Sequence, residues 1–443
     1  MIYNQRFYAD FLGALKRITK VSSTITVMVS GLALFSDGYN AQIIGYMNPL
    51  FSELYKDAGF GSTIKTRLSN SYLIGEIFGM LFFGFLIDRI GRRTGIIFAT
   101  LFLVLGVIIA TAAHGTTPLG MFWMMIIGRG IAGFGAGGEY PTCATGSSEA
   151  ADENEHVRRR RGILVAMATD FSIDLGFVVA GVVALIVLAA YNERTSDGVW
   201  RVCFGLGFVL PVALFFFRIR MIESTQFRKH AMKQSIPYML VLRRYWKPML
   251  GTSLAWFMYD FNIGYGTVVN LFYLPGCVVG GFLMDWIGRK QTMTLGFICW
   301  AIMGFIIGGA LGPIQSITPL FLILYGIFNA FGEMGPGVAT FLCGAESFPT
   351  PIRGHFLGLA AAFGKAGAAI GTQVFTPIQN RVFLIGAAFA ATGGLIAWFL
   401  IPDRERDLEN EDARFRAYLE ANGYSGLFGE SLEKDLKTTT FKV

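Results

Sequence analysis

Six ionisable side chains stand deep inside apolar stretches of this 443-residue sequence, where an unpaired charge is costly. Each lies 10 to 17 residues from a charged residue at one end of its stretch. At a rise of 1.5 Å per helical residue, all six reach a similar depth, about 15–26 Å from that end. The residues of this predicted layer are Asp37, Glu139, Asp174, Asp260, Glu333 and Lys365. Because five carboxyl groups accompany one lysine, the layer predicts a site for a polar or charged cargo, with surplus groups that can carry protons.

Further residue types extend this layer. Asp170 lies one helical turn from Asp174, on the same face. Trp256 and Tyr259 accompany Asp260, and aromatic rings beside an acid can cradle a sugar, an inositol or a quaternary ammonium. The same rings would serve equally well in helix packing. The pattern leaves four candidates for the proton carrier: Asp37, Glu139, Asp170 and Asp174.

Arg129 lies ten residues before Glu139, at the start of the glycine-rich run 128–138. Glycine-rich loops can hold phosphate, but this run has no following Lys-Ser/Thr and no preceding strand. We therefore interpret it as the seam of a close helix–helix contact.

A second chemical pattern occurs twice. The phrase Gly-x-x-x-Asp-x-x-Gly-Arg fills 84–92 and again 281–289, 197 residues later. The same offset separates Glu149 from Glu346, and an Arg-Gly pair opens the apolar stretch that follows each glutamate. Such carboxylates can face helix N-termini and pair with arginines, so we predict a latch that breaks and re-forms between two states. Its predicted members are Asp88, Arg92, Glu149, Asp285, Arg289, Glu346 and Arg353.

Apolar segments must position these groups. Hydrophobic residues make up 53% of the chain and charged residues only 15%, which predicts a polytopic membrane protein. The repeat offset then predicts an all-α fold of twelve transmembrane helices in two pseudo-symmetric six-helix bundles. The twelve expected segments are 22–50, 69–88, 94–113, 119–147, 162–191, 200–217, 248–261, 265–287, 291–311, 317–345, 354–379 and 382–401.

Basic residues gather in alternate loops, which predicts that those loops and both termini are cytoplasmic. We therefore divide the chain into five parts. These are an N-terminal cytoplasmic segment (1–20), a first bundle (21–221), a central cytoplasmic loop (222–246), a second bundle (247–401) and a cytoplasmic tail (402–443).

The repeat register fails at one place. Asp37 precedes Asp88 by 51 residues, whereas Asp260 precedes Asp285 by only 25. If these acids are equivalent, the second half is short by 26 residues, and its first apolar segment is too short to cross a bilayer. We predict that residues are missing at the junctions 261/262 and 380/381; the alternative is a truncated protein.

The residue pattern favours no other function. The five cysteines form no Cys-x-x-Cys pair and the four histidines have no metal spacing, so we expect no metal and no cofactor besides the coupling proton. No nucleophile–base pair stands out, so we do not expect an enzyme. The net charge of +7 comes from basic loops, which argues against a nucleic-acid partner.

The repeated phrase, the Arg129 motif and the twelve segments resemble the major facilitator superfamily. Within it, GGEYP at 137–141, ESFPT at 346–350 and GKAGA at 364–368 resemble the phosphate:proton symporter family. FSDGYN at 35–40, HGTT at 114–117, GMFWM at 120–124 and WFMYDF at 256–261 look like the fungal glycerophosphoinositol and glycerophosphocholine permeases. The resemblance implies a plasma-membrane protein, surrounded by lipids, that imports glycerophosphodiesters. We expect this importer to be a monomer.

The resemblance also implies roles. Lys365 would bind the phosphodiester, with Arg129 as the alternative cation, and Asp37 and Glu139 would handle protons. The full predicted substrate site is Tyr140, Asp174, Trp256, Tyr259, Asp260, Glu333 and Lys365.

Phosphate porters typically carry Asp at the position of Glu139, Gln near Asp170 and Asp174, and Asn at the position of Gly337. These departures argue against inorganic phosphate and suit a polyol or a choline head group. Inorganic phosphate import and a nutrient-sensing receptor with a transporter fold remain the alternatives.

Overall fold

Helices form nearly all of the regular structure in the computed structural model. The structure describes residues 27–28, 31–56, 59–219, 224–232, 236–262, 269–375, 381–403, 408–424 and 428–429. Within these ranges, the one β-interaction is an isolated bridge between Met232 and Phe428. The expected segment 1–20 lies outside the described residues.

The first half begins with a helix over 31–54. It continues with α2 (Ser62–Ile90), α3 (Arg92–Thr111), α4 (Pro118–Asp152), α5 (Glu155–Arg158), α6 (Arg161–Ala168), α7 (Asp170–Ala190), α8 (Asp197–Leu206) and α9 (Val209–Arg218). After α10 (Thr225–His230), the second half contains α11 (Tyr238–Asn262), η1 (Val269–Phe272), α12 (Tyr273–Trp286), α13 (Arg289–Gly309), α14 (Leu311–Gln315), α15 (Thr318–Gly332), η2 (Glu333–Gly337), α16 (Val338–Glu346), α17 (Arg353–Phe375), α18 (Val382–Leu400) and α19 (Leu408–Ala421).

Every expected apolar segment overlaps one or more of these helices, but several are interrupted. Thr169 separates α6 from α7, and the π-helical turn η2, which contains Pro336, separates α15 from α16. Proline removes a backbone donor and π-turns disturb the helical ladder, so such breaks bring functional side chains and backbone groups into the interior. Asp170 and Glu333 stand at these two breaks.

Glycines set the close contact between α2 and α4. A Cβ atom at Gly75 would overlap the backbone of Gly130, and one at Gly133 or Gly137 would overlap the backbone of Tyr72 or Glu76. The run 128–138 is therefore the helix seam that the sequence predicted, because only small residues allow this approach.

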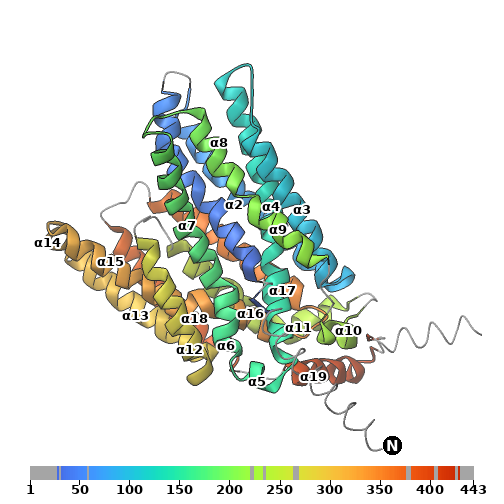
Figure 1. The fold of residues 1–443 in the computed structure, drawn as a ribbon. Coiled ribbons are helices and arrows are strands. Elements are labelled where there is room, and N and C mark those ends of the chain that lie inside the picture. The colour runs from blue at the N-terminus through green and yellow to red at the C-terminus, as the bar shows by residue number, and fades with distance from the viewer. Residues whose placement is uncertain are drawn as a thin grey trace, which may run out of the picture.

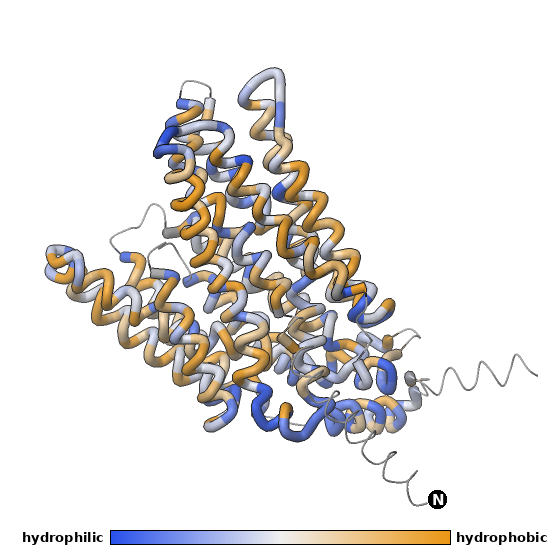
Figure 2. Tube along the Cα trace, in the orientation of Figure 1, coloured by the Kyte–Doolittle hydropathy of each residue, from blue (hydrophilic) through white to orange (hydrophobic). Residues whose placement is uncertain are grey.

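The helices of the two halves lie together at one end and spread apart towards α8 and α14 (Figure 1). The closed end carries α5, α10 and α19, and hydrophilic residues gather there (Figure 2). We call it the polar end. Elsewhere the outer surface exposes large apolar side chains such as Phe78, Leu185 and Phe216. An apolar exterior of this kind is suited to lipid.

Six stretches of the described chain are long and apolar enough to cross a membrane. They are Arg92–Thr111, Pro118–Asp152, Arg161–Ala190, Asp197–Phe216, Arg289–Gly309 and Val382–Leu400.

The range expected as a central loop is partly helical. It contains α10, and α11 begins at Tyr238, ten residues before the expected start of the seventh segment. The early turns of α11 form because Val241 and Tyr245 are buried against Phe415 and Leu419 of α19. The seventh segment is thus a 25-residue helix, longer than the sequence suggested.

The second half is short at α12. This helix has 14 residues, whereas α2, which carries the equivalent copy of the repeated phrase, has 29. The prediction of missing residues at 261/262 and 380/381 stays a prediction. Phe261 and Asn262 both lie in α11, and residue 380 lies outside the described residues.

The tail helix α19 is docked on the polar end. Asp412 accepts hydrogen bonds from the backbone N–H (2.6 Å) and the hydroxyl (2.7 Å) of Thr350, and Phe415 is fully buried. Replacing Phe415 with alanine should release α19, because truncating a buried phenylalanine costs about 3–5 kcal/mol. Trypsin should then cleave at Arg414 and Arg416 at least tenfold faster.

The control is Tyr418→Phe, which removes only the hydroxyl that donates to the Leu240 carbonyl (3.2 Å). Equal cleavage rates for the native chain and the Phe415→Ala variant would show that this ring does not hold α19 in place.

Candidate functional site

A cavity of about 80 Å³ lies between the two halves and brings the predicted substrate residues together. All seven line it: Tyr140, Asp174, Trp256, Tyr259, Asp260, Glu333 and Lys365. They come from α4, α7, α11, η2 and α17, so residues more than 200 positions apart share one site. Of the six residues in the predicted layer, four line the cavity: Asp174, Asp260, Glu333 and Lys365.

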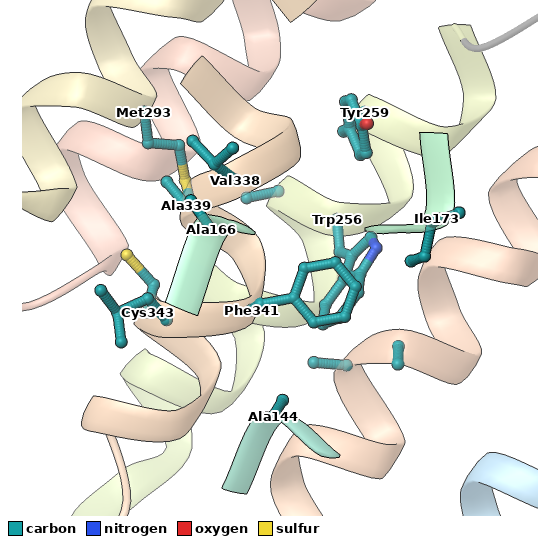
Figure 3. Close-up of a cluster of buried hydrophobic side chains, with 14 of the residues drawn as sticks. Ala144, Ala166, Ile173, Trp256, Tyr259, Met293, Val338, Ala339, Phe341 and Cys343 are labelled. Atoms are coloured by element: carbon teal, nitrogen blue, oxygen red, sulfur yellow. The ribbon is translucent and has the colours of Figure 1, made fainter. Parts of the chain in front are cut away.

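Aromatic rings form one wall of the cavity. Phe341 lies between Trp256 and Tyr140, with ring centroids 4.8 Å and 5.7 Å away, and Figure 3 shows it beside Trp256. The sequence reasoning missed Phe341, since a lone phenylalanine in an apolar segment carries no signal. The Nζ atom of Lys365 lies 4.9 Å from the centre of the Tyr140 ring, a cation–π contact that orients the ammonium group.

Carboxyl groups gather in another part of the cavity. Four atoms that could ligate a metal ion lie within 4.8 Å of one another. They are one carboxylate oxygen each of Asp170, Asp174 and Glu333, and the thiol sulfur of Cys277. Tyr259 donates a hydrogen bond to Glu333 (2.6 Å), and Cys277 donates to Asp174 (3.1 Å). This set of oxygen and sulfur atoms is compact enough to surround a small cation, a possibility that the spacing of the histidines and cysteines did not suggest.

Gly337 makes room for this cluster. A side chain there would collide with the carboxylates of Asp170 and Glu333, and with the hydroxyl of Tyr259. A residue as large as asparagine therefore does not fit beside these acids in the present arrangement.

Lys365 has an ionic partner that the sequence reasoning missed. Its Nζ atom lies 3.8 Å from Glu76, which is fully buried. In the described structure, neither carboxylate oxygen of Glu76 accepts a hydrogen bond. The depth count could have found Glu76, because it lies twelve residues before Asp88 in the same apolar segment.

Asp37 and Arg129 are not among the residues that line the cavity. Asp37 accepts a hydrogen bond from the Tyr72 hydroxyl (2.9 Å). Arg129 donates to the carbonyls of Leu68 (3.0 Å) and Asn40 (3.2 Å), and it borders a separate small cavity with Tyr72 and Asn40. The structure therefore places Lys365, and not Arg129, with the predicted substrate residues.

Glu139 also faces away from the cavity. It pairs with Arg218 (2.6 Å) and accepts a hydrogen bond from Thr100 (3.2 Å), so it points towards α3 and α9. Its neighbour Tyr140 lines the cavity instead, because successive helical residues point about 100° apart. Arg218 ends α9 and is buried.

The residues of the predicted latch contact one another at the polar end. Asp88 accepts hydrogen bonds from the backbone N–H groups of Gly354 (3.1 Å) and His355 (2.9 Å), at the start of α17. Asp285 accepts equivalent bonds from Gly162 (2.8 Å) and Ile163 (3.0 Å), at the start of α6. Each aspartate thus caps a helix of the opposite half, where the helix dipole favours a negative charge.

Ion pairs complete the latch. Glu149 pairs with Arg92 (2.9 Å) and Arg353 (2.8 Å). Glu346 pairs with Arg289 (3.2 Å) and also with Arg161 (2.6 Å). All seven predicted members take part, and the sequence reasoning missed two partners: Arg161, and His355, whose Nδ1 lies 2.6 Å from Asp88.

Two repeated halves with a charged cavity between them are the architecture of a membrane transporter. The chain belongs to the sugar (and other) transporter family of the major facilitator superfamily. The family model matches residues 24–244 and 251–410.

Several fungal relatives are similar over nearly the whole chain. The Candida albicans glycerophosphoinositol permease 1 is 37% identical over 93% of this chain and 84% of its own length. The Saccharomyces cerevisiae glycerophosphoinositol transporter 1 is 35% identical over 96% of this chain and 88% of its own. A Candida albicans glycerophosphocholine permease is 32% identical over 91% and 83%.

A solved structure shares the fold. The proton:xylose symporter XylE, bound to 6-bromo-6-deoxy-D-glucose, superposes with a TM-score of 0.77 at 17% sequence identity. The match covers 89% of this chain and 99% of XylE.

Proposed function

We propose that this protein imports glycerophosphodiesters across the plasma membrane. The names of the fungal relatives support this cargo. The observation that carries it is the division of charge in the cavity, where Lys365 is the one cation among the described lining residues and four carboxyl groups accompany it. An anionic phosphodiester suits the lysine, and a polyol or an amine head group suits the acids.

The substrate contacts follow from this division. The phosphodiester replaces Glu76 as the partner of Lys365. The Nζ atom and the Glu76 carboxylate are 3.8 Å apart, which is too far for a hydrogen bond, so the ammonium group can donate one to the phosphodiester. The glycerol and the head group pack against the aromatic rings of Tyr140, Trp256 and Tyr259. Their hydroxyl or amine groups donate hydrogen bonds to the carboxylates of Asp174, Asp260 and Glu333.

We further propose alternating access of two six-helix bundles, 21–221 and 247–401, joined by the central segment 222–246. In this arrangement the chain crosses the membrane twelve times. The segment 1–20, the tail 402–443 and the polar end are cytoplasmic. The closed latch then belongs to a state in which cargo cannot leave to the cytoplasm, and the halves rock to break it.

Proton coupling completes the proposal. Asp37 and Glu139 are the candidate carriers, and each has a partner that responds to its charge, Tyr72 for Asp37 and Arg218 for Glu139. Both lie within hydrogen-bonded groups next to the cavity, which is where a protonation change can bias the two states.

Uptake into vesicles tests the function and its coupling. Labelled glycerophosphocholine and glycerophosphoinositol should accumulate against a gradient when the outside is acidic, and a protonophore should abolish this accumulation. Vesicles without the protein and the surface variant Lys247→Gln serve as controls. Uptake that ignores the proton gradient would refute the coupling, and competition by inorganic phosphate at substrate concentrations would favour a phosphate porter.

A further inference from the structure

Glu76 of α2 loses its ionic partner when a phosphodiester takes its place at Lys365. The Glu76 side chain is fully buried, and neither of its carboxylate oxygens accepts a hydrogen bond within the described residues. In the same part of the chain, Lys365 is the one basic side chain that lies within 4.0 Å of it. Glu76 is thus a buried acid with a single ionic partner, and the cargo requires the same partner.

The ion pair between Glu76 and Lys365 connects the two halves at the central cavity. The helix α2 belongs to the first half and α17 to the second. Lys365 lines the cavity, whereas Glu76 is not among the lining residues. The backbone of Glu76 packs closely on α4, because a Cβ atom at Gly137 would overlap its carbonyl oxygen. The ammonium group can therefore pair with cargo in the cavity, while Glu76 stays fixed in the protein interior.

A second acid lies against Glu76. The Asp37 side chain is buried and lies within hydrogen-bonding reach of the Glu76 carboxyl group. Ionised carboxylates only accept hydrogen bonds, so this contact becomes a hydrogen bond only when one of the two groups holds a proton. Asp37 also accepts a hydrogen bond from the Tyr72 hydroxyl (2.9 Å). The two acids therefore form a place where one proton can be held or passed on.

Lys365 is the main positive group that acts on Glu76. Arg129 also interacts with it, but the Arg129 guanidinium group donates to the carbonyls of Leu68 (3.0 Å) and Asn40 (3.2 Å) and forms no ion pair with Glu76 within the described residues. The other neighbours are acids or phenols, which supply no counter-charge. The titratable and charged groups that interact with Glu76 are Asp37 of the helix over 31–54, Tyr72 of α2, Arg129 and Tyr140 of α4, Asp260 of α11 and Lys365 of α17.

The partner of Lys365 therefore decides which charge Glu76 can hold. While Lys365 pairs with Glu76, the carboxylate has a counter-charge. When a phosphodiester accepts hydrogen bonds from Nζ instead, Glu76 is left as a buried acid near Asp37 and Asp260. A carboxylate without a counter-charge is unfavourable in a protein interior, and protonation removes that charge. Binding of the cargo thus creates a demand for one proton at Glu76.

We propose, on the basis of the function proposed above, that Glu76 takes up the coupling proton when a phosphodiester binds to Lys365. The proton reaches Glu76 through Asp37 and forms an O–H bond on the Glu76 carboxyl group. One negative charge enters with the phosphodiester and one positive charge enters with the proton, so the net charge around Lys365 does not change. When the cargo leaves, the proton leaves Glu76, and its carboxylate pairs with the ammonium group again.

Counterflow in vesicles that contain the full chain tests this role. Counterflow exchanges labelled for unlabelled glycerophosphoinositol at equal pH on both sides, so it needs cargo binding but no net proton movement. Glu76→Gln, which imitates the protonated carboxyl group, should keep counterflow and lose the accumulation that an acidic exterior drives. The KM of native counterflow should rise about tenfold from acidic to neutral pH, because each cargo binds with one proton, and the KM of the variant should change less than about twofold.

Two further variants make the result specific. Glu76→Asp keeps a titratable group and should retain acid-driven accumulation, whereas equal losses in the Asp and Gln variants would show that shape rather than a proton matters there and would overturn the proposal. Glu155→Gln, which alters the exposed Glu155–Arg159 pair, is the matched control and should behave as the native chain does. Acid-driven accumulation that survives in Glu76→Gln, or loss of its counterflow, would also contradict this role of Glu76. Absence of counterflow in the native chain would instead refute the proposed cargo, on which this role depends.

Discussion

Replacing Lys365 with alanine should lower the uptake of labelled glycerophosphodiesters about a hundredfold, chiefly through a higher KM. Lys365 is the one cation in the described lining of the central cavity, among four carboxyl groups. Without it, the phosphodiester carries an unpaired charge in a negative site, and losing one partner of a buried charge pair costs about 2–5 kcal/mol. Saturation curves of uptake into vesicles measure the change.

Two variants make this result specific. Lys365→Arg keeps the charge and should retain part of the uptake. Lys247→Ala removes an exposed lysine from α11 and should change nothing. If Lys365→Ala keeps the native KM, the phosphate cation is elsewhere, and Arg129→Ala becomes the variant that should lose binding.

Replacing Glu149 with glutamine should open the polar end. Glu149 is fully buried and pairs with Arg92 and Arg353, one from each half. Glutamine keeps the shape but removes the carboxylate that both guanidinium groups share. Arg92 keeps its pair with Asp88 (2.8 Å), whereas Arg353 loses its ion-pair partner, and breaking such a buried pair costs about 3–5 kcal/mol. That cost falls on the closed state, so the open state should gain population and uptake should fall at least tenfold.

Thiol labelling reports the change directly. A cysteine placed at Ala368, which lines the central cavity, is the reporter in a chain whose five native cysteines are replaced. Glu149→Gln should make this cysteine react faster with an impermeant maleimide applied at the polar end. Glu155→Gln is the matched control, because the Glu155–Arg159 pair is exposed and joins no two halves. Equal labelling of all three chains would mean that Glu149 does not hold the closed state.

The latch was predictable from the sequence because it depends on a repeat. The 197-residue offset identified Asp88, Asp285, Glu149 and Glu346 as equivalent pairs, and equivalent residues meet equivalent partners in a pseudo-symmetric fold. His355 was missed because it occurs in only one copy; Ile163 follows the glycine in the other.

The sequence predicted how deep the cavity residues lie along their helices, but not which way their side chains point. Counting residues along a helix gives height, and the lining residues from Tyr140 to Lys365 lie together as expected. The direction of each side chain around its helix depends on which neighbours pack there. Glu139, which the depth count placed in the cargo layer, therefore faces Arg218, and the alternative cation Arg129 faces Leu68 and Asn40.

The polar end was the least predictable part. Hydropathy separates apolar segments from charged ones, so the prediction made 222–246 a cytoplasmic loop and 402–443 a cytoplasmic tail. Their helices form because α10, α11 and α19 bury one face against each other and against the latch, as Val241 and Phe415 do. That burial is tertiary, and a pattern within one segment does not report it.

The reciprocal capping by Asp88 and Asp285 has a consequence for how the molecule changes state. Each half both gives a carboxylate and receives one, so separating the halves at either contact exposes an uncapped helix start and an unpaired acid at once. A half-separated molecule would lose one contact and strain the other without gaining a new partner. The switch between the two states should therefore be cooperative, with both capping contacts breaking together.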